Sequence, residues 1–77
     1  MVEDASTAQA REMLGSLEGL LVGLARKLER VEEECNRRTS TRGAALQRRQ
    51  RAELRREIYE AHRLIDGIHR RFPQTAG

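Results

Sequence analysis

Apolar residues recur along the first half of the chain at alternating spacings of four and three residues. This is the heptad pattern of helices that pack side by side, with a seam at heptad positions a and d. Ser6 and Gln9 have the spacing of a capping box, so we expect a helix over residues 7–36 after a frayed segment at 1–6. The first seam consists of Ala10, Leu14, Leu17, Leu21, Leu24, Leu28, Val31 and Cys35, with Met13 and Leu20 beside it at position g. The wide stripe is typical of a helix bundle.

The second half of the chain repeats this pattern. It predicts a helix over residues 44–72, which Pro73 ends, so residues 73–77 should fray. The second seam consists of Leu54, Ile58, Ala61, Ile65, Ile68 and Phe72, with Leu64 beside it at position g.

A polar break at residues 37–43 separates the two segments, and we expect it to form a connecting loop. Thr39, Ser40 or Thr41 can each cap the helix that follows. Gln47 and Arg51 occupy expected core positions at the start of the second helix. We therefore expect its first turns to be helical but weakly packed.

The two halves of the chain carry opposite charge. Residues 1–36 have a net charge of −4 and residues 37–77 one of +7, which together give the +3 of the chain. Opposite charge and matching apolar patterns favour helices that fold back on each other. The predicted fold class is all-α: a two-helix antiparallel hairpin, coiled-coil-like, that completes a four-helix bundle by oligomerisation. The register that matches both patterns sets Leu14, Leu17 and Leu21 opposite Ile65, Ala61 and Ile58, and Glu32, Glu33 and Glu34 near Arg48, Arg49 and Arg51.

Composition limits the chain to one small domain. Its 77 residues are 38% hydrophobic, 35% charged and only 3% aromatic, so the core is thin for a monomer. One cysteine, Cys35, permits no internal disulfide. The longest apolar run, residues 13–25, contains Glu18 and is shorter than the roughly 20 residues of a membrane span. The N-terminus is acidic, unlike a secretory signal, and we expect an intracellular protein, cytoplasmic or nuclear.

No group of residues has the spacing of a catalytic site. The carboxylates lie on long helices without a matched partner, and a glycine-rich phosphate loop is missing from the sequence. His62 and His69 are two helical turns apart, about 10 Å, which is too far to share a metal ion without other ligands. We expect both at the edge of the helix interface, and we expect no enzyme activity, cofactor or metal ion.

Three glycines recur at every fourth residue of the first helix, on the face opposite its leucines: Gly15, Gly19 and Gly23. Such a strip lets another helix backbone approach closely, and we interpret it as a secondary helix-docking strip. The alternative is an exposed face that tolerates glycine, at about 1 kcal/mol each relative to alanine. Either way, the glycines weaken the isolated helix, which then depends on packing.

Basic side chains on the outer face of the second helix form an arginine stripe around a single tyrosine. The stripe suits an acidic partner or a phosphate backbone. It is equally compatible with a solvated face that Glu53, Glu57 and Glu60 neutralise in part. In the preceding loop, Arg37 and Arg38 give Ser40 the sequence context of a kinase site. The arginine stripe consists of Arg48, Arg55, Arg56, Tyr59, Arg63 and Arg70.

These patterns favour a non-catalytic assembly or adaptor module that mediates protein–protein interaction. Its partner would be a second copy, as a homodimer, or other helical subunits. The alternative is a small nucleic-acid-binding hairpin that uses the arginine stripe. In topology the chain is similar to the small helical hairpins that pair into antiparallel four-helix bundles, including plasmid RNA-binding hairpins, although no shared motif carries this similarity. The expected interface consists of Leu14, Leu17, Leu21, Leu24, Leu28, Val31, Leu54, Ile58, Ile65, Ile68 and Phe72.

Overall fold

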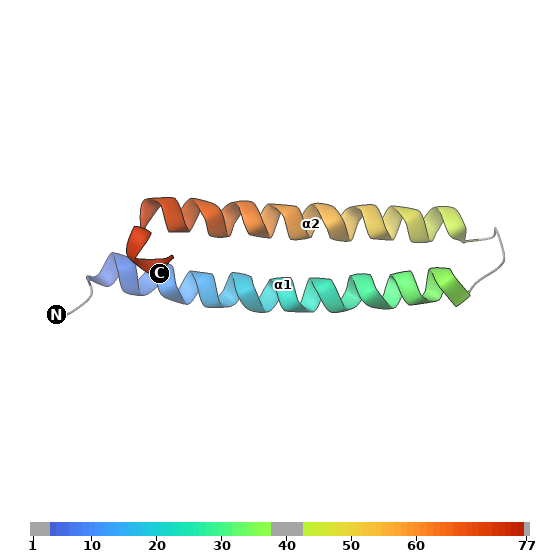
Figure 1. The fold of residues 1–77 in the computed structure, drawn as a ribbon, viewed down its shortest axis with the longest axis horizontal. Helices are drawn as coiled ribbons and strands as arrows, with labels where there is room; N and C mark the ends of the chain where they lie inside the picture. The colour runs from blue at the N-terminus through green and yellow to red at the C-terminus, as the bar shows by residue number, and fades with distance from the viewer. Residues whose placement is uncertain (1–3, 38–42, 77) are drawn as a thin grey trace.

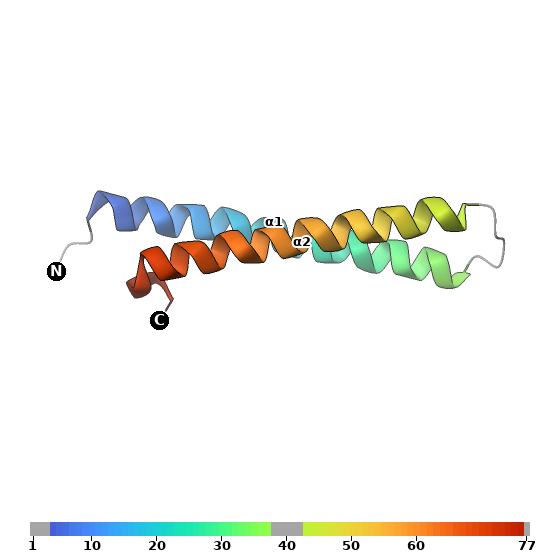
Figure 2. The same ribbon diagram turned by 90° about the horizontal axis from the view of Figure 1, so that it is seen from above.

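Two long helices lie side by side in a computed structural model of the chain, which describes residues 4–37 and 43–76. Helix α1 spans Ala5–Arg37, helix α2 spans Ala44–Arg71, and a short 3₁₀-helix, η1, spans Pro73–Thr75. The two long helices run antiparallel and form a rod of 60 × 17 × 15 Å (Figure 1). They cross obliquely near the middle of the rod (Figure 2). The prediction of an all-α helical hairpin is confirmed.

Asp4 caps the start of α1. The backbone N–H of Thr7 donates a hydrogen bond to Asp4 Oδ1 at 2.7 Å, which satisfies a group that the first helical turn leaves without a partner. Hydrogen bonds from the Thr7 side chain and backbone hold the pKa of Asp4 below its ordinary value of 3.8. The predicted capping box of Ser6 and Gln9 is wrong, because α1 already begins at Ala5.

The seam between the helices is narrow. Each helix turns only one stripe of side chains toward the other, so few of them lose all contact with water. Two elements without a further layer cannot enclose a thick core. The buried apolar residues are Ala10, Leu14, Leu24, Ala61 and Ile65; the half-buried seam residues are Leu17, Leu21, Leu28, Val31, Leu54, Ile58, Ile68 and Phe72.

A polar pair lies in the seam near the end of the rod where α1 stops and α2 starts. Gln47 is buried, and its Oε1 accepts a hydrogen bond from the Cys35 thiol, with 3.2 Å between oxygen and sulfur. The prediction that Gln47 occupies a core position is confirmed. The hydrogen bond satisfies an amide oxygen that would otherwise be costly to bury.

Helix α2 starts at a glycine whose backbone conformation requires glycine. Gly43 occupies the N-cap position with φ of 87°, in the left-handed region that residues with a side chain rarely adopt. No side chain caps this helix with a hydrogen bond from that position. The predicted capping residues Thr39, Ser40 and Thr41 lie outside the described part of the chain.

The other end of the rod is closed by η1, which folds back onto α1. Gln74 donates a hydrogen bond from Nε2 to Thr7 Oγ1 at 2.9 Å, and Arg11 donates one from Nη2 to the carbonyl oxygen of Gln74 at 3.2 Å. The prediction that residues 73–76 fray is therefore wrong. Pro73 ends α2 as expected, but its fixed φ also suits the first position of a new helical turn.

The helices are offset by about one helical turn from the predicted register. Cys35 lies opposite Gln47, whereas the predicted register sets Glu32 there. Glu32 pairs instead with Arg55 across the seam. Charge alone could not fix the register, because five arginines occur within residues 48–56. The apolar pattern could not fix it either, because a and d positions alternate every three or four residues, so a shift of one turn still sets apolar positions opposite each other.

Candidate interaction surface

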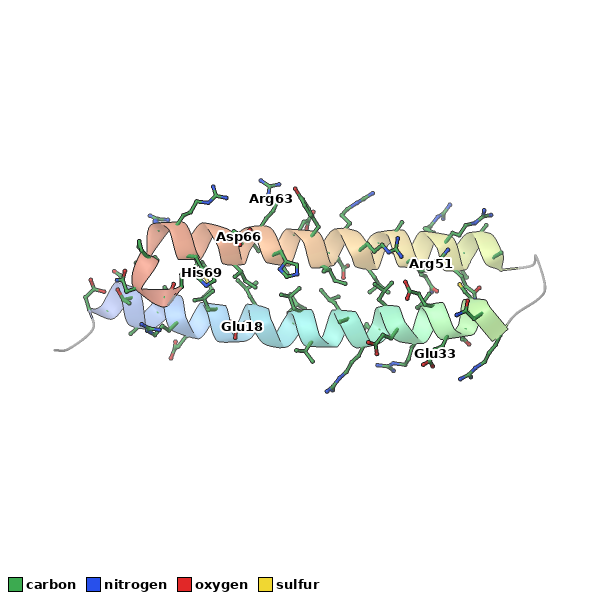
Figure 3. All side chains as sticks on the ribbon, in the orientation of Figure 1. Glu18, Glu33, Arg51, Arg63, Asp66 and His69 are labelled. Atoms are coloured by element: carbon green, nitrogen blue, oxygen red, sulfur yellow. The ribbon has the colours of Figure 1, made fainter. Side chains whose placement is uncertain are left out.

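One long edge of the hairpin is polar. In an antiparallel helix pair, the e positions of both helices flank the seam on one side and the g positions flank it on the other. On the e side, Arg55 Nη2 and Glu32 Oε1 form an ion pair at 3.2 Å. Both side chains are well exposed, so the pair contributes only about 0–1 kcal/mol. His69 is half-buried on the side of α2 that faces α1 (Figure 3), and His62 is exposed.

The opposite edge is apolar in the half of the rod that holds the ends of the chain. Met13, Leu20 and Leu64, all at position g, have 54%, 52% and 59% of their surface exposed. We call these three residues the apolar edge. Full burial of one such side chain is worth about 1.5–3 kcal/mol, so covering all three together would stabilise an assembly substantially.

Two grooves between the helices join the residues of the apolar edge into one surface. Leu64 lines both grooves: one, of about 520 Å³, extends to Met13, and the other extends to Leu20. Apolar seam residues line both grooves, Ile68 and Phe72 the first and Leu24 and Ala61 the second, so each groove offers an apolar side chain of a partner a surface to pack on. The first groove is lined mainly by Ala10, Met13, Leu64, Gly67, Ile68 and Phe72, and the second by Leu20, Leu24, Glu57, Glu60, Ala61 and Leu64.

The residues predicted as an oligomer interface lie largely between α1 and α2, where the two helices of one hairpin cover them in part. Three of them also line the grooves beside Leu64: Ile68 and Phe72 in the groove that extends to Met13, and Leu24 in the groove that extends to Leu20. Met13, Leu20 and Leu64 are predicted beside the seam at position g but are not among the predicted interface residues. The signal that could have assigned them to the interface is the contrast between apolar g positions and charged e positions.

The glycine strip of α1 faces open space. A Cβ atom added at Gly15, Gly19 or Gly23 would meet no other atom within 4 Å, and all three residues are exposed. Among the described residues, nothing packs on this face. A secondary docking strip at these glycines therefore stays a prediction.

The arginine stripe is divided in the structure. Arg55 reaches across the seam to Glu32, so it does not project from the outer face as the sequence pattern predicts. Arg63 does point away from α1 (Figure 3), and Tyr59 is 64% exposed. The remaining members of the stripe are also exposed: Arg48, Arg56 and Arg70.

Other chemistry is sparse in the described residues. They contain no group of three or more His, Cys, Asp or Glu side chains that could hold a metal ion. Neither of their two long helices combines the length and hydrophobicity that a membrane crossing demands. Cys35 is a free, half-buried thiol. Ser40, the predicted modification site, lies outside the described ranges.

Comparison with protein families, curated proteins and solved structures yields no match for this chain.

Proposed function

We propose that the chain is a non-catalytic helical assembly module that binds another pair of helices through its apolar edge and so completes a four-helix bundle. The observation that carries this proposal is the exposed area. The hairpin has 6384 Å² of accessible surface, whereas a compact monomer of its mass has about 4,800 Å². The excess of about 1,600 Å² is the size of the area that each subunit buries in an obligate dimer.

The shape of the hairpin supports the same proposal. Its radius of gyration is 17.1 Å, and a compact domain of this length has one of about 11 Å. Only five apolar residues are buried, and two of them are alanines. Burial of so small a core offsets little of the conformational entropy that the chain loses on folding. A second layer of helices against the grooves would enlarge that core without changing the hairpin.

The proposed partner is a second copy or another helical subunit, and the proposed setting is intracellular, where the Cys35 thiol stays reduced. The competing function, nucleic-acid binding through the arginine stripe, has less support. Arg55 is engaged with Glu32, and three glutamates of α2 lie among the remaining arginines.

Analytical ultracentrifugation of matched variants tests the proposal. Leu64→Lys places a charge on the apolar edge, and Tyr59→Lys places one at a similarly exposed site on the outer face of α2. Leu20→Glu and Val22→Glu form a second pair, since both wild-type side chains are 52% exposed. We expect Leu64→Lys and Leu20→Glu to raise the dissociation constant at least about a hundredfold, because each copy loses one buried leucine contact.

The control variants should associate like the wild type, and all four should keep the helical circular dichroism of the wild type at high concentration. A wild-type chain that sediments as a folded monomer at micromolar concentration would overturn the proposal. Equal weakening by the edge variants and their controls would overturn the assignment of the apolar edge.

A further inference from the structure

Charge is distributed unevenly along the rod. The half next to the turn, residues 26–37 and 43–56, carries nine basic and five acidic side chains. The half that holds the chain ends, residues 4–25 and 57–76, carries four basic and six acidic side chains. One end of the hairpin is therefore positive by four charges, and the other is negative by two.

On the g face of α2 the order of charge is the reverse of this, with a negative side chain toward the turn and a positive one toward the chain ends. Glu57, Leu64 and Arg71 are each seven residues apart, so they occupy successive g positions on one face of the helix. Glu57 lines the groove that reaches Leu20, and Arg71 lines the groove that reaches Met13. Leu64 lies between them and lines both grooves.

This arrangement is complementary to itself when reversed. If two copies pack with α2 against α2 in opposite directions, Leu64 meets Leu64, and Glu57 of each copy meets Arg71 of the other. A two-fold axis perpendicular to the rod generates both ion pairs at once, as an isologous interface requires. The same rotation sets the positive halves of the two copies at opposite ends of the dimer, outside the overlapping region and far from each other.

We infer that the partner is a second copy of this chain, bound antiparallel through the apolar edge, with the turns of the two hairpins at opposite ends of the bundle. This inference rests on the proposed assembly function and adds the identity and direction of the partner. Centred on Leu64, the two copies overlap along roughly half of the 60 Å rod, and a strip of that length and 17 Å width offers on the order of 500 Å² per partner, about 1,000 Å² in total, which is the lower limit for a specific interface. A dimer with both turns at the same end would instead place the two positive halves side by side.

Charge exchange tests the pairing of Glu57 with Arg71. Glu57→Arg and Arg71→Glu each give like charges at both contacts of a homodimer, so each should raise the dissociation constant by about tenfold. A mixture of the two variants should form heterodimers preferentially, because both contacts are then complementary. The double variant E57R/R71E should recover the wild-type dissociation constant.

Glu29→Arg and Arg70→Glu are matched controls that change net charge equally at exposed sites away from the g positions. They should leave the dissociation constant within about twofold of the wild type. Circular dichroism at equal concentration verifies that each variant still folds.

Spin labels report the direction of the partner independently of these variants. A label on Arg49→Cys, in a Cys35→Ser background, lies 15 residues from Leu64. Antiparallel pairing centred on Leu64 separates the two labels by about 45 Å along the rod, at 1.5 Å per residue. With the turns at the same end, only the thickness of the bundle separates them, roughly 30 Å.

A dimer with the short distance, or one in which Arg71→Glu has no effect and the mixture gives no heterodimers, would overturn the antiparallel pairing and leave the proposed assembly function in place. A wild-type chain that associates only with a different helical subunit would overturn the second copy as partner alone, whereas one that stays a folded monomer would overturn both proposals. The wild-type measurement thus separates the failure of the two proposals.

Discussion

The thiol of Cys35 and the amide oxygen of Gln47 meet at 3.2 Å inside the seam between α1 and α2. A polar pair at one level of a heptad seam is satisfied only when the helices are aligned at that level. A shift by one turn would set Gln47 opposite another residue and leave its buried amide oxygen without the thiol, which is unfavourable. The pair therefore selects one register among several that the leucines alone would accept.

Replacing one or both members of this pair should show whether it stabilises the hairpin or only fixes the alignment of the two helices. We expect Gln47→Ala to lower the free energy of unfolding by about 1–3 kcal/mol, because it opens a gap and leaves the thiol without its acceptor. The double change Cys35→Val and Gln47→Leu should be neutral or stabilising, as two apolar groups replace two polar ones. Urea unfolding measures stability, and label distances between the helices should broaden in the double variant. An unchanged, narrow distance distribution would show that other contacts fix the register.

Replacement by alanine should have opposite effects on stability at two glycines that differ in backbone conformation. Gly19→Ala adds a methyl group in open space within a helix, so it should raise the free energy of unfolding by up to about 1 kcal/mol. Gly43→Ala forces a residue with a side chain into the left-handed region of backbone conformation and should lower the free energy of unfolding by about 1 kcal/mol. Thermal melts of both variants at one protein concentration give the comparison.

The bulkier change Gly19→Leu tests the docking strip. It should leave the dissociation constant unchanged, because the apolar edge lies on a different face of α1 from the strip. Weaker association of a more helical Gly19→Leu variant would show instead that a partner helix packs closely against the glycines.

Asp4 should make the stability of the hairpin depend on acid pH. Because its pKa is lowered in the folded chain, the ionised carboxylate stabilises α1 above about pH 3.8, and this contribution disappears as the pH falls through the lower folded pKa. Asp4→Asn keeps an acceptor at the cap without a charge. We expect the wild type to melt at a higher temperature than Asp4→Asn at about pH 6, and the gap to close at about pH 2. A constant gap across this range would mean that the carboxylate does not hold the cap.

The arginine stripe should not support strong nucleic-acid binding. Each phosphate that a protein neutralises adds about one unit to the salt slope of binding. The triple change of Arg55, Arg56 and Arg63 to Gln would lower that slope by about two to three units if these side chains bound a phosphate chain. We expect only weak oligonucleotide binding by the wild type in a fluorescence titration over several salt concentrations. Tight, steeply salt-dependent binding that the triple variant loses would favour the nucleic-acid function.

Much of this fold could be predicted because a heptad is a repeating signal. Its period gives two helices, the stripe on each gives the seam, and opposite charge on the two halves favours the hairpin. The ends could not be derived in the same way, because each depends on a single local contact. Asp4 and Ser6 are equally good capping residues in isolation. Nothing in the order of Pro73 and Gln74 indicates that Gln74 reaches Thr7.

The candidate interaction surface was harder to predict for a different reason. The heptad repeat of apolar residues identifies which residues face another helix, but it does not show whether that helix belongs to the same chain. Leu17 and Ile58 face the other helix of the hairpin and are half-covered by it. The heptad pattern predicts Leu64 beside the seam, and the structure adds that more than half of its surface is exposed.

The hydrogen bonds between η1 and α1 also indicate the order in which the hairpin folds. Sequence separation grows steadily along the rod: 12 residues between Cys35 and Gln47, 23 between Glu32 and Arg55, and 67 between Thr7 and Gln74. Each contact made nearer the turn shortens the loop that the next one must close, so the hairpin can close like a zipper from the turn outward. The half that carries the apolar edge then closes last and opens first. Amide hydrogen exchange should be fastest there in the isolated hairpin, and assembly should slow it most in that half.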